Sequence, residues 1–199
     1  MQVRLTMDLI GYRLPKGHRL RVALSSASFP LVWSPKKRAD LTLKSGTPSL
    51  ELPLSKAPYI PMPFEPPESA PPCRVDAIRT GHPKRTISED VGSGEVSVII
   101  EDDMGDIKFL DHGLQVEQYA KETYTSHPDD ATRTRANIEW VYRARREGEK
   151  DSFAVTVVSR YHLHCDASMF YLNAEQHAYE DDKLVSDKSW QREIPRTAI

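Results

Sequence analysis

The feature that most constrains this chain is a strict alternation of apolar and polar residues over several long runs. In one run Ile138, Trp140 and Tyr142 fall at every second position, with polar Asn137 and Glu139 beside them. Comparable runs occupy residues 113–124, 153–165, 169–179 and 183–190. A period of two is typical of β-strands that have one side on a core and the other in water. The pattern predicts an antiparallel meander in which only a short stretch near residues 129–135 could be helical.

The prolines divide the chain into two parts. Of its 15 prolines, 11 lie between Pro30 and Pro72. Proline lacks a backbone donor and is excluded from helix interiors and central strands. Residues 57–83 are therefore predicted to form an extended, polyproline-like crossing between residues 1–56 and residues 84–199.

Hairpins are predicted on both sides of the crossing. Residues 3–9 alternate between apolar and polar, and residues 20–24 do so again after a turn at residues 14–17. A second hairpin is expected over residues 41–54, around the turn-forming residues 45–48. Further hairpin strands are predicted where two apolar runs flank the acidic turn sequence 101–106. The predicted fold class is all-β.

Charge and composition exclude several classes of protein. Residues 1–83 carry 12 basic and 6 acidic residues, and the rest of the chain carries 15 and 23, so the two parts have opposite charges of +6 and −8. Neither part is basic enough to indicate a nucleic-acid partner, and opposite charges favour contact between the parts or with another domain. No run approaches 18 apolar residues, and the first ten residues lack the apolar core of a secretory signal. Cys73 and Cys165 have no C-x-x-C spacing. A cytoplasmic protein without a membrane partner is expected.

Motifs that would carry catalysis or bind metal are incomplete. No G-x-S-x-G sequence occurs, and Gly92-Ser93-Gly94 is interpreted as a loop. His162 and His164 form an H-x-H pair on one strand face, but the strand period turns Cys165 to the other face, so two ligands remain. The acidic doublets lack calcium-loop spacing and are interpreted as turns. We expect no catalytic residue, no metal and no cofactor. A metal enzyme built on the histidine pair stays as a minor alternative.

Three aromatic residues leave a second alternative open. Trp140, Tyr142 and Trp190 could form a platform for a sugar, which would make the chain a free-standing small-ligand or carbohydrate-binding β-sandwich module. Trp140 and Tyr142 share a face with Ile138, however, which favours a place in the core.

One segment resembles a known family. Residues 17–30 read GHRLRVALSSASFP, followed by Trp33. They resemble the segment G-H-R-(L/I)-R-(L/V)-(A/S)-(L/I)-S-S-x-x-(F/W)-P, late in the C-terminal jelly roll of CocE/NonD-type serine hydrolases. That family includes cocaine-esterase-like enzymes and X-Pro dipeptidyl-peptidases. Weaker similarity to a C-terminal extension of bacterial members covers residues 41–53, 122–130, 178–180 and 190–196.

The resemblance implies a non-catalytic role. The jelly roll of this family carries no catalytic residue, because the Ser, Asp and His lie in a preceding α/β-hydrolase domain, and no position here matches them. The chain resembles a fragment that opens inside the jelly roll, which makes the expected fold an antiparallel, jelly-roll-like β-sandwich with a long-stranded C-terminal meander. Residues 1–56 would supply late jelly-roll strands. The expected partner is the catalytic α/β-hydrolase domain of the same parent protein, an enzyme of ester or amide hydrolysis, with a homo-oligomer as a further expectation.

The residues of the motif have structural roles in this interpretation. Gly17 would supply a tight turn, while Arg19 and Arg21 would face outward toward carboxylates of a neighbouring domain. Phe29 and Trp33 would anchor the exit from the strand by burial. An unpaired strand edge near residues 2–10 would favour self-association. The structural or interface candidates are Gly17, His18, Arg19, Arg21, Phe29, Pro30 and Trp33.

Overall fold

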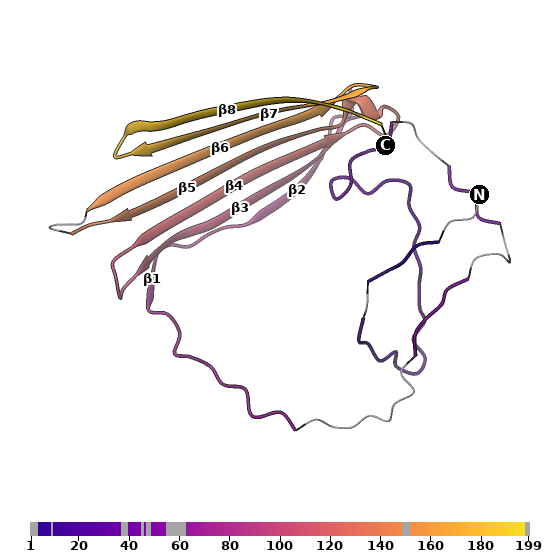
Figure 1. Cartoon of the computed structure of the whole chain (residues 1–199), viewed down its shortest axis with the longest axis horizontal. Helices are drawn as coiled ribbons and strands as arrows, with labels where there is room; N and C mark the ends of the chain where they lie inside the picture. Colours follow the sequence, from indigo (N-terminus) through magenta and orange to yellow (C-terminus); the bar gives the residue numbers. More distant parts are fainter. Residues whose placement is uncertain are drawn as a thin grey trace.

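A computed structural model describes residues 4–8, 10–36, 40–44, 46, 49–54, 63–148 and 152–197. In it, eight antiparallel strands form one open sheet (Figure 1). The strands are β1 (Val75–Arg79), β2 (Lys84–Glu89), β3 (Val96–Phe109), β4 (Gln115–Ser126), β5 (Arg135–Arg146), β6 (Phe153–Cys165), β7 (Met169–Glu180) and β8 (Lys183–Pro195). Strands β3 to β8 lie in chain order, and β1 and β2 both pair with β3 at one edge. The all-β, antiparallel class with a long-stranded C-terminal meander is confirmed.

The boundaries of the meander follow the alternation closely. Strand β6 has the bounds that the pattern predicts, and β4, β5, β7 and β8 differ from prediction by a few residues at their ends. The short helix expected near residues 129–135 is the 3-10 helix η1 (Ala131–Arg133). Asp130 caps η1, since its carboxylate accepts a hydrogen bond of 2.9 Å from the backbone N–H of Thr132.

The hairpins predicted in residues 1–56 are not present as strands among the described residues of that part. The turn at residues 14–17 does form, with Gly17 at φ +87° and the His18 N–H donating to the Pro15 carbonyl. On either side of the turn, the described residues form no strand pairing, and Leu20 is 56% exposed. A strand needs a ladder partner, and a lone hairpin is marginal in water. Residues 1–3, 9, 45, 47–48 and 55–62, which these predictions also include, lie outside the described residues.

The described part of the predicted crossing begins at residue 63. Residues 63–74 have no regular structure and are exposed. They run apart from the sheet to the start of β1, from the side where the N-terminal part lies (Figure 1). Strand β1 forms inside the predicted crossing, because Val75 to Arg79 find a ladder partner in the end of β3.

The prediction of an acidic turn at residues 101–106 is wrong. Strand β3 continues through it, with a β-bulge between Asp103 and Asp106. Gly105 has φ +79° at the bulge, and the Asp103 carboxylate accepts its backbone N–H at 2.9 Å. Gly81 lies against the bulge so closely that a Cβ on Gly81 would come 2.2 Å from the Asp103 carbonyl oxygen. The bulge thus divides the sheet edge into the short strands β1 and β2.

The register places most of the large apolar side chains of the sheet on one side, which we call the apolar face. One row across it runs Glu122, Ile138, Tyr161, Ala174, Trp190 from β4 to β8. Further members of this face are Val98, Ile100, Val116, Ala120, Tyr124, Ala136, Trp140, Tyr142, Ala144, Val155, Val157, Leu163, Cys165, Phe170 and Leu172, with Asp102, Lys188 and Arg192 at the margins. We call the opposite side the polar face.

The sheet is a single layer, and its core is therefore small. The buried hydrophobic residues are Ala120, Ala136, Ala144 and Cys165, all on the apolar face. The accessible surface is 16805 Å², whereas a compact protein of this mass exposes about 9,500 Å². The described residues contain no second sheet packed on the first. Most of the apolar face is thus exposed to solvent in this chain.

Candidate functional site

The three aromatic residues proposed as a platform lie on the apolar face, where the alternation places them. Trp140, Tyr142 and Trp190 are 45%, 37% and 40% exposed. Their shared face with Ile138 is confirmed by the register. They are not buried, however, because no described residue covers the centre of the face.

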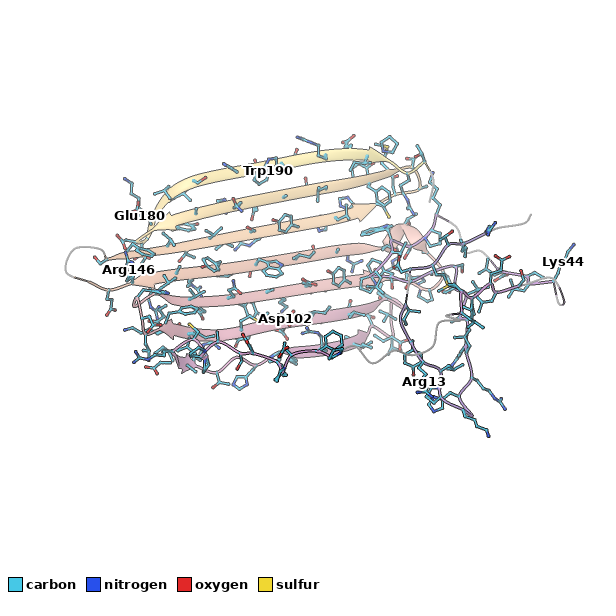
Figure 2. All side chains as sticks on the ribbon, turned by 60° about the horizontal axis from the view of Figure 1, so that its bottom comes forward. Arg13, Lys44, Asp102, Arg146, Glu180 and Trp190 are labelled. Atoms are coloured by element: carbon cyan, nitrogen blue, oxygen red, sulfur yellow. The ribbon has the colours of Figure 1, made fainter. Side chains whose placement is uncertain are left out.

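Charged side chains on the apolar face lie toward its two sides and at the ends of β5 and β7, where the register places Arg146 and Glu180. Asp102 and Glu122 lie on β3 and β4, while Lys188 and Arg192 lie on β8. Figure 2 shows Asp102 and Trp190 toward opposite margins of the sheet. Between these margins the face consists mostly of aliphatic, aromatic and small side chains, with the amides of Gln118 and Gln176 among them. Such an arrangement, an apolar centre with a charged rim, is typical of a surface that another protein surface covers.

The end of the family-like motif, together with Trp33 just after it, packs on one end of the apolar face. The Phe29 ring meets Tyr124 edge-on with centroids 5.9 Å apart, and the Trp33 ring meets Phe170 in the same way at 5.7 Å. Trp33 Nε1 also donates to Cys165 Sγ at 3.3 Å. We call this contact the aromatic anchor. It joins the N-terminal part to strands β4, β6 and β7.

A buried arginine completes the aromatic anchor. Arg196 is 1% exposed, and its guanidinium donates to the carbonyl oxygens of Ser34 at 3.0 Å and Asp166 at 2.7 Å. It also donates to Cys165 Sγ at 3.1 Å and lies over the Phe170 ring. The side chain therefore bridges the N-terminal part, the β6–β7 turn and the sheet.

The proposed interface candidates separate into two groups. Phe29, Pro30 and Trp33 are partly buried at the sheet, whereas Gly17, His18, Arg19 and Arg21 are exposed and lie apart from it. No described carboxylate forms an ion pair with Arg19 or Arg21. Sequence reasoning missed Tyr124, Cys165, Phe170 and Arg196 as partners of the anchor. A signal was available, since Arg196 and Tyr124 fall within the weaker family-like segments.

The β6–β7 turn that Arg196 contacts is held by one carboxylate. Asp166 accepts hydrogen bonds from the backbone N–H groups of Ser168 at 2.6 Å and Met169 at 2.7 Å, and from the Tyr171 hydroxyl at 2.7 Å. These donors, led by the Ser168 N–H, hold the pKa of Asp166 well below its usual range. The turn is thereby a rigid support for the anchor.

The polar face satisfies its own charges. Arg160 lies between Glu139 at 2.6 Å and Glu175 at 3.1 Å, and Arg79 joins Asp103 to Glu117. These pairs cross neighbouring strands, where opposite charges stabilise a sheet. A face with internally paired charges is stable in water, so the polar face needs no protein partner.

The histidine pair lies on the polar face, opposite Cys165, as predicted. The ring centroids of His162 and His164 are 4.8 Å apart, and His162 Nδ1 is 2.5 Å from Asn137 Oδ1. Partial burial and then the neighbouring His164 lower the pKa of His162. Within the described ranges, no three His, Cys, Asp or Glu side chains are grouped to hold a metal ion.

Glu95 supplies a testable electrostatic contribution. Its carboxylate contacts Arg135 at 2.7 Å and Arg133 at 3.0 Å, and chiefly the hydrogen bond from Arg135 lowers its pKa to about 2. Because the folded pKa lies below the unfolded value of about 4.3, Glu95 stabilises the fold above that pH and loses this effect as pH falls toward 2. We expect Glu95→Gln to lower the melting temperature at pH 7, with the difference from the wild type shrinking below about pH 4.3.

Thermal melts followed by circular dichroism from pH 7 to pH 2 would measure this difference. Glu89→Gln is the matched control, because Glu89 is exposed on β2 and forms no ion pair among the described residues. A melting difference for Glu95→Gln that is the same at pH 3 and pH 7 would contradict the assignment.

Comparison with known proteins finds a family similarity in the N-terminal part. Residues 1–62 match the model of the X-Pro dipeptidyl-peptidase C-terminal non-catalytic domain. The resemblance seen in the GHRLRVALSSASFP segment is thereby confirmed. By its description this is a non-catalytic domain of a peptidase, which implies a catalytic domain elsewhere in such a protein. No curated protein and no solved structure matches the chain. No helix in the described part of the chain is long and apolar enough to span a membrane.

Proposed function

We propose that this chain is a non-catalytic region of a cytoplasmic serine hydrolase, and that its apolar face packs on the catalytic α/β-hydrolase domain of the same protein. The observation that carries the proposal is the exposed apolar face. One end of this face is already covered by the aromatic anchor, which begins at Phe29 within the family-like motif. Continuity with that contact indicates that the rest of the face also meets the parent protein.

The proposed organisation has three parts. Residues 1–56 belong to the non-catalytic domain, an extended crossing follows, and the long-stranded meander forms the docking layer. The first strand of the meander sheet, β1, begins at Val75, whereas the sequence predicts the start of the meander at residue 84. The size of the sheet supports a stable interface, since six strand spacings of about 4.8 Å and strands of about 40 Å allow more than 1,000 Å² of contact on one side.

A second copy of the chain fits the apolar face less well. A two-fold axis along the strands would bring the aromatic anchors of both copies together at the same end of the sheets. A two-fold axis across the strands would instead place Lys188 and Arg192 of one copy against Lys188 and Arg192 of the other. The catalytic domain requires neither the meeting of two anchors nor the contact between like charges. We therefore propose the catalytic domain, and not a second copy of the chain, as the partner of the apolar face.

A lysine placed in the apolar face should separate this proposal from its competitors. Val157 lies on the apolar face, and its neighbour Val158 lies on the polar face. In the complete hydrolase, Val157→Lys should cost about 3 kcal/mol or more because a charge enters the interface, whereas Val158→Lys should be nearly neutral. In the 199-residue chain alone, both substitutions should have small effects. Thermal melts of the four proteins measure this.

Labelling with a fluorophosphonate serine probe tests the hydrolase assignment separately. The product of the complete reading frame should be labelled, and the 199-residue chain should not. Labelling of the short chain, or of neither product, would overturn the assignment. Equal melting of the Val157→Lys and Val158→Lys hydrolases would overturn the docking face alone. A Val157→Lys hydrolase that melts like the wild type but dissociates from dimer to monomer would show that the face serves oligomerisation instead.

A further inference from the structure

The polar face is hollowed by a groove that the proposed function does not use. The groove has a volume of about 600 Å³ and extends from β4 to β8. Two neighbouring rows of side chains line it. The first, which we call the hydrogen-bonding row, runs Thr123, Asn137, His162, Asn173, Gln191, and the second, the charged row, runs Lys121, Glu139, Arg160, Glu175.

The hydrogen-bonding row offers donors and acceptors that the protein itself leaves free. Asn173 and Gln191 are exposed, and within the described residues their side-chain amides have no hydrogen-bond partner. His162 Nδ1 donates to Asn137 Oδ1, which leaves His162 Nε2 as an acceptor and the Asn137 amide N–H groups as donors. Adjacent strands repeat these groups at intervals of about 4.8 Å, so the row presents about 19 Å of uncharged polar groups.

The charged row restricts the kind of ligand that fits. Arg160 is held between Glu139 and Glu175, with contacts of 2.6 Å and 3.1 Å. Lys121 lies 4.0 Å from Glu101 on the neighbouring strand. Because the cations already have carboxylate partners, an anionic ligand gains little here, and the alternating carboxylates disfavour it further. The groove therefore suits a neutral ligand rich in hydrogen-bonding groups.

We propose that this groove binds a neutral oligosaccharide lying across the strands along the hydrogen-bonding row. Vicinal hydroxyls carry donors and acceptors together, and the side-chain amides of Asn173 and Gln191 match such pairs in two-point contacts. An extended peptide fits less well, since its backbone groups pair with a strand edge and its side chains need separate pockets. The site lies opposite the docking face, so it goes beyond the proposed function and stands or falls independently of it.

The site differs from the aromatic platform considered from the sequence. Trp140, Tyr142 and Trp190 project from the apolar face, on the other side of the sheet. Trp190 borders the groove because its backbone lies between the two rows. A ligand on the polar face remains accessible even when the catalytic domain covers the apolar face.

Titration of the chain with defined hexasaccharides tests the proposal. Maltohexaose, cellohexaose, xylohexaose, mannohexaose and chitohexaose would be added separately, with calorimetry and the side-chain amide NMR signals as readouts. We expect at least one to bind with a Kd of about 1 mM or tighter and to shift the amide signals of Asn173 and Gln191. Asn173→Ala and Gln191→Ala should each weaken that binding about tenfold. Gln118→Ala is the matched control, since Gln118 is an amide on the apolar face.

Each other outcome counts against the site. No binding by any of the five sugars at about 10 mM would overturn the proposal. Binding that Gln118→Ala weakens as much as Asn173→Ala does would place the sugar on the apolar face and overturn it too. A neutral Gly-Ser hexapeptide that binds more tightly than the sugars and shifts the same amide signals would replace the oligosaccharide by a peptide.

Discussion

Gly105→Ala should lower the free energy of unfolding by at least about 3 kcal/mol and detach the edge strands β1 and β2 from the sheet. Gly105 has φ +79°, a conformation that costs an L-residue about 1–2 kcal/mol. The added Cβ would also lie 2.4 Å from the Arg79 carbonyl oxygen and 2.7 Å from the Gly81 nitrogen. Both neighbours are backbone atoms, so the clash can be relieved only by moving the β1 end of the edge.

Hydrogen exchange of the β1 and β2 amides, together with thermal melting, measures this effect. Gly113→Ala is the matched control, because Gly113 also has a positive φ of +72° but its nearest contact is a side-chain carbon of Arg146 at 3.8 Å. Gly113→Ala should therefore cost only the conformational part, about 1 kcal/mol. If the two variants have the same melting temperature, the close approach of the two backbones does not contribute to the loss of stability, and the proposed role of Gly105 in the bulge is wrong.

The same bulge shows where prediction from the sequence ends. An acidic, glycine-containing run at residues 101–106 is compatible with a hairpin turn and with a bulge, and local patterns do not distinguish them. The distinction depends on Arg79 and Gly81, which lie more than 20 residues earlier. Arg79 pairs with Asp103, and Gly81 provides the space that the bulge needs. Only a contact between distant segments decides the outcome.

The faces of the meander, in contrast, are predictable because a strand period is local. Ile138, Trp140 and Tyr142 lie on one side as the alternation requires, and Cys165 turns away from His162. The number of layers is not local, however. An apolar face predicts that something covers it, but the covering surface need not belong to the same segment. The alternation in residues 1–56 likewise indicates strands only where ladder partners are present.

The two candidate sites differ in how far the sequence could reveal them. Phe29 and Trp33 were expected to anchor their segment because a motif singles them out. The hydrogen-bonding row has no sequence signature, since Asn137, Asn173 and Gln191 are separated by up to 54 positions and each looks like an ordinary exposed polar residue. They become neighbours only through the register of four strands.

Arg196→Ala should have the second large effect on stability, again about 3 kcal/mol, and should release the aromatic anchor. The guanidinium is buried, and it donates to the carbonyl oxygens of Ser34 and Asp166 and to Cys165 Sγ. Alanine would leave the partly buried carbonyl oxygens of Ser34 and Asp166 without this donor and would open a cavity beside Phe170. Arg196→Lys should restore little, because a single ammonium cannot span acceptors on three segments as a planar guanidinium does.

Release of the anchor can be followed at Trp33. Its indole contacts Phe170 and Cys165 beside Arg196, so its fluorescence should shift to longer wavelength and become more accessible to quenchers in Arg196→Ala. Arg192→Ala is the control on the preceding strand β8, since Arg192 is exposed and, among the described residues, donates only to the carbonyl of its neighbour Gln191. It should leave both the melting temperature and Trp33 nearly unchanged. Loss of stability without a change at Trp33 would mean that Arg196 supports the β6–β7 turn alone. The anchor would then depend on its aromatic contacts, and the joint between the family-like segment and the sheet would be weaker than the buried guanidinium implies.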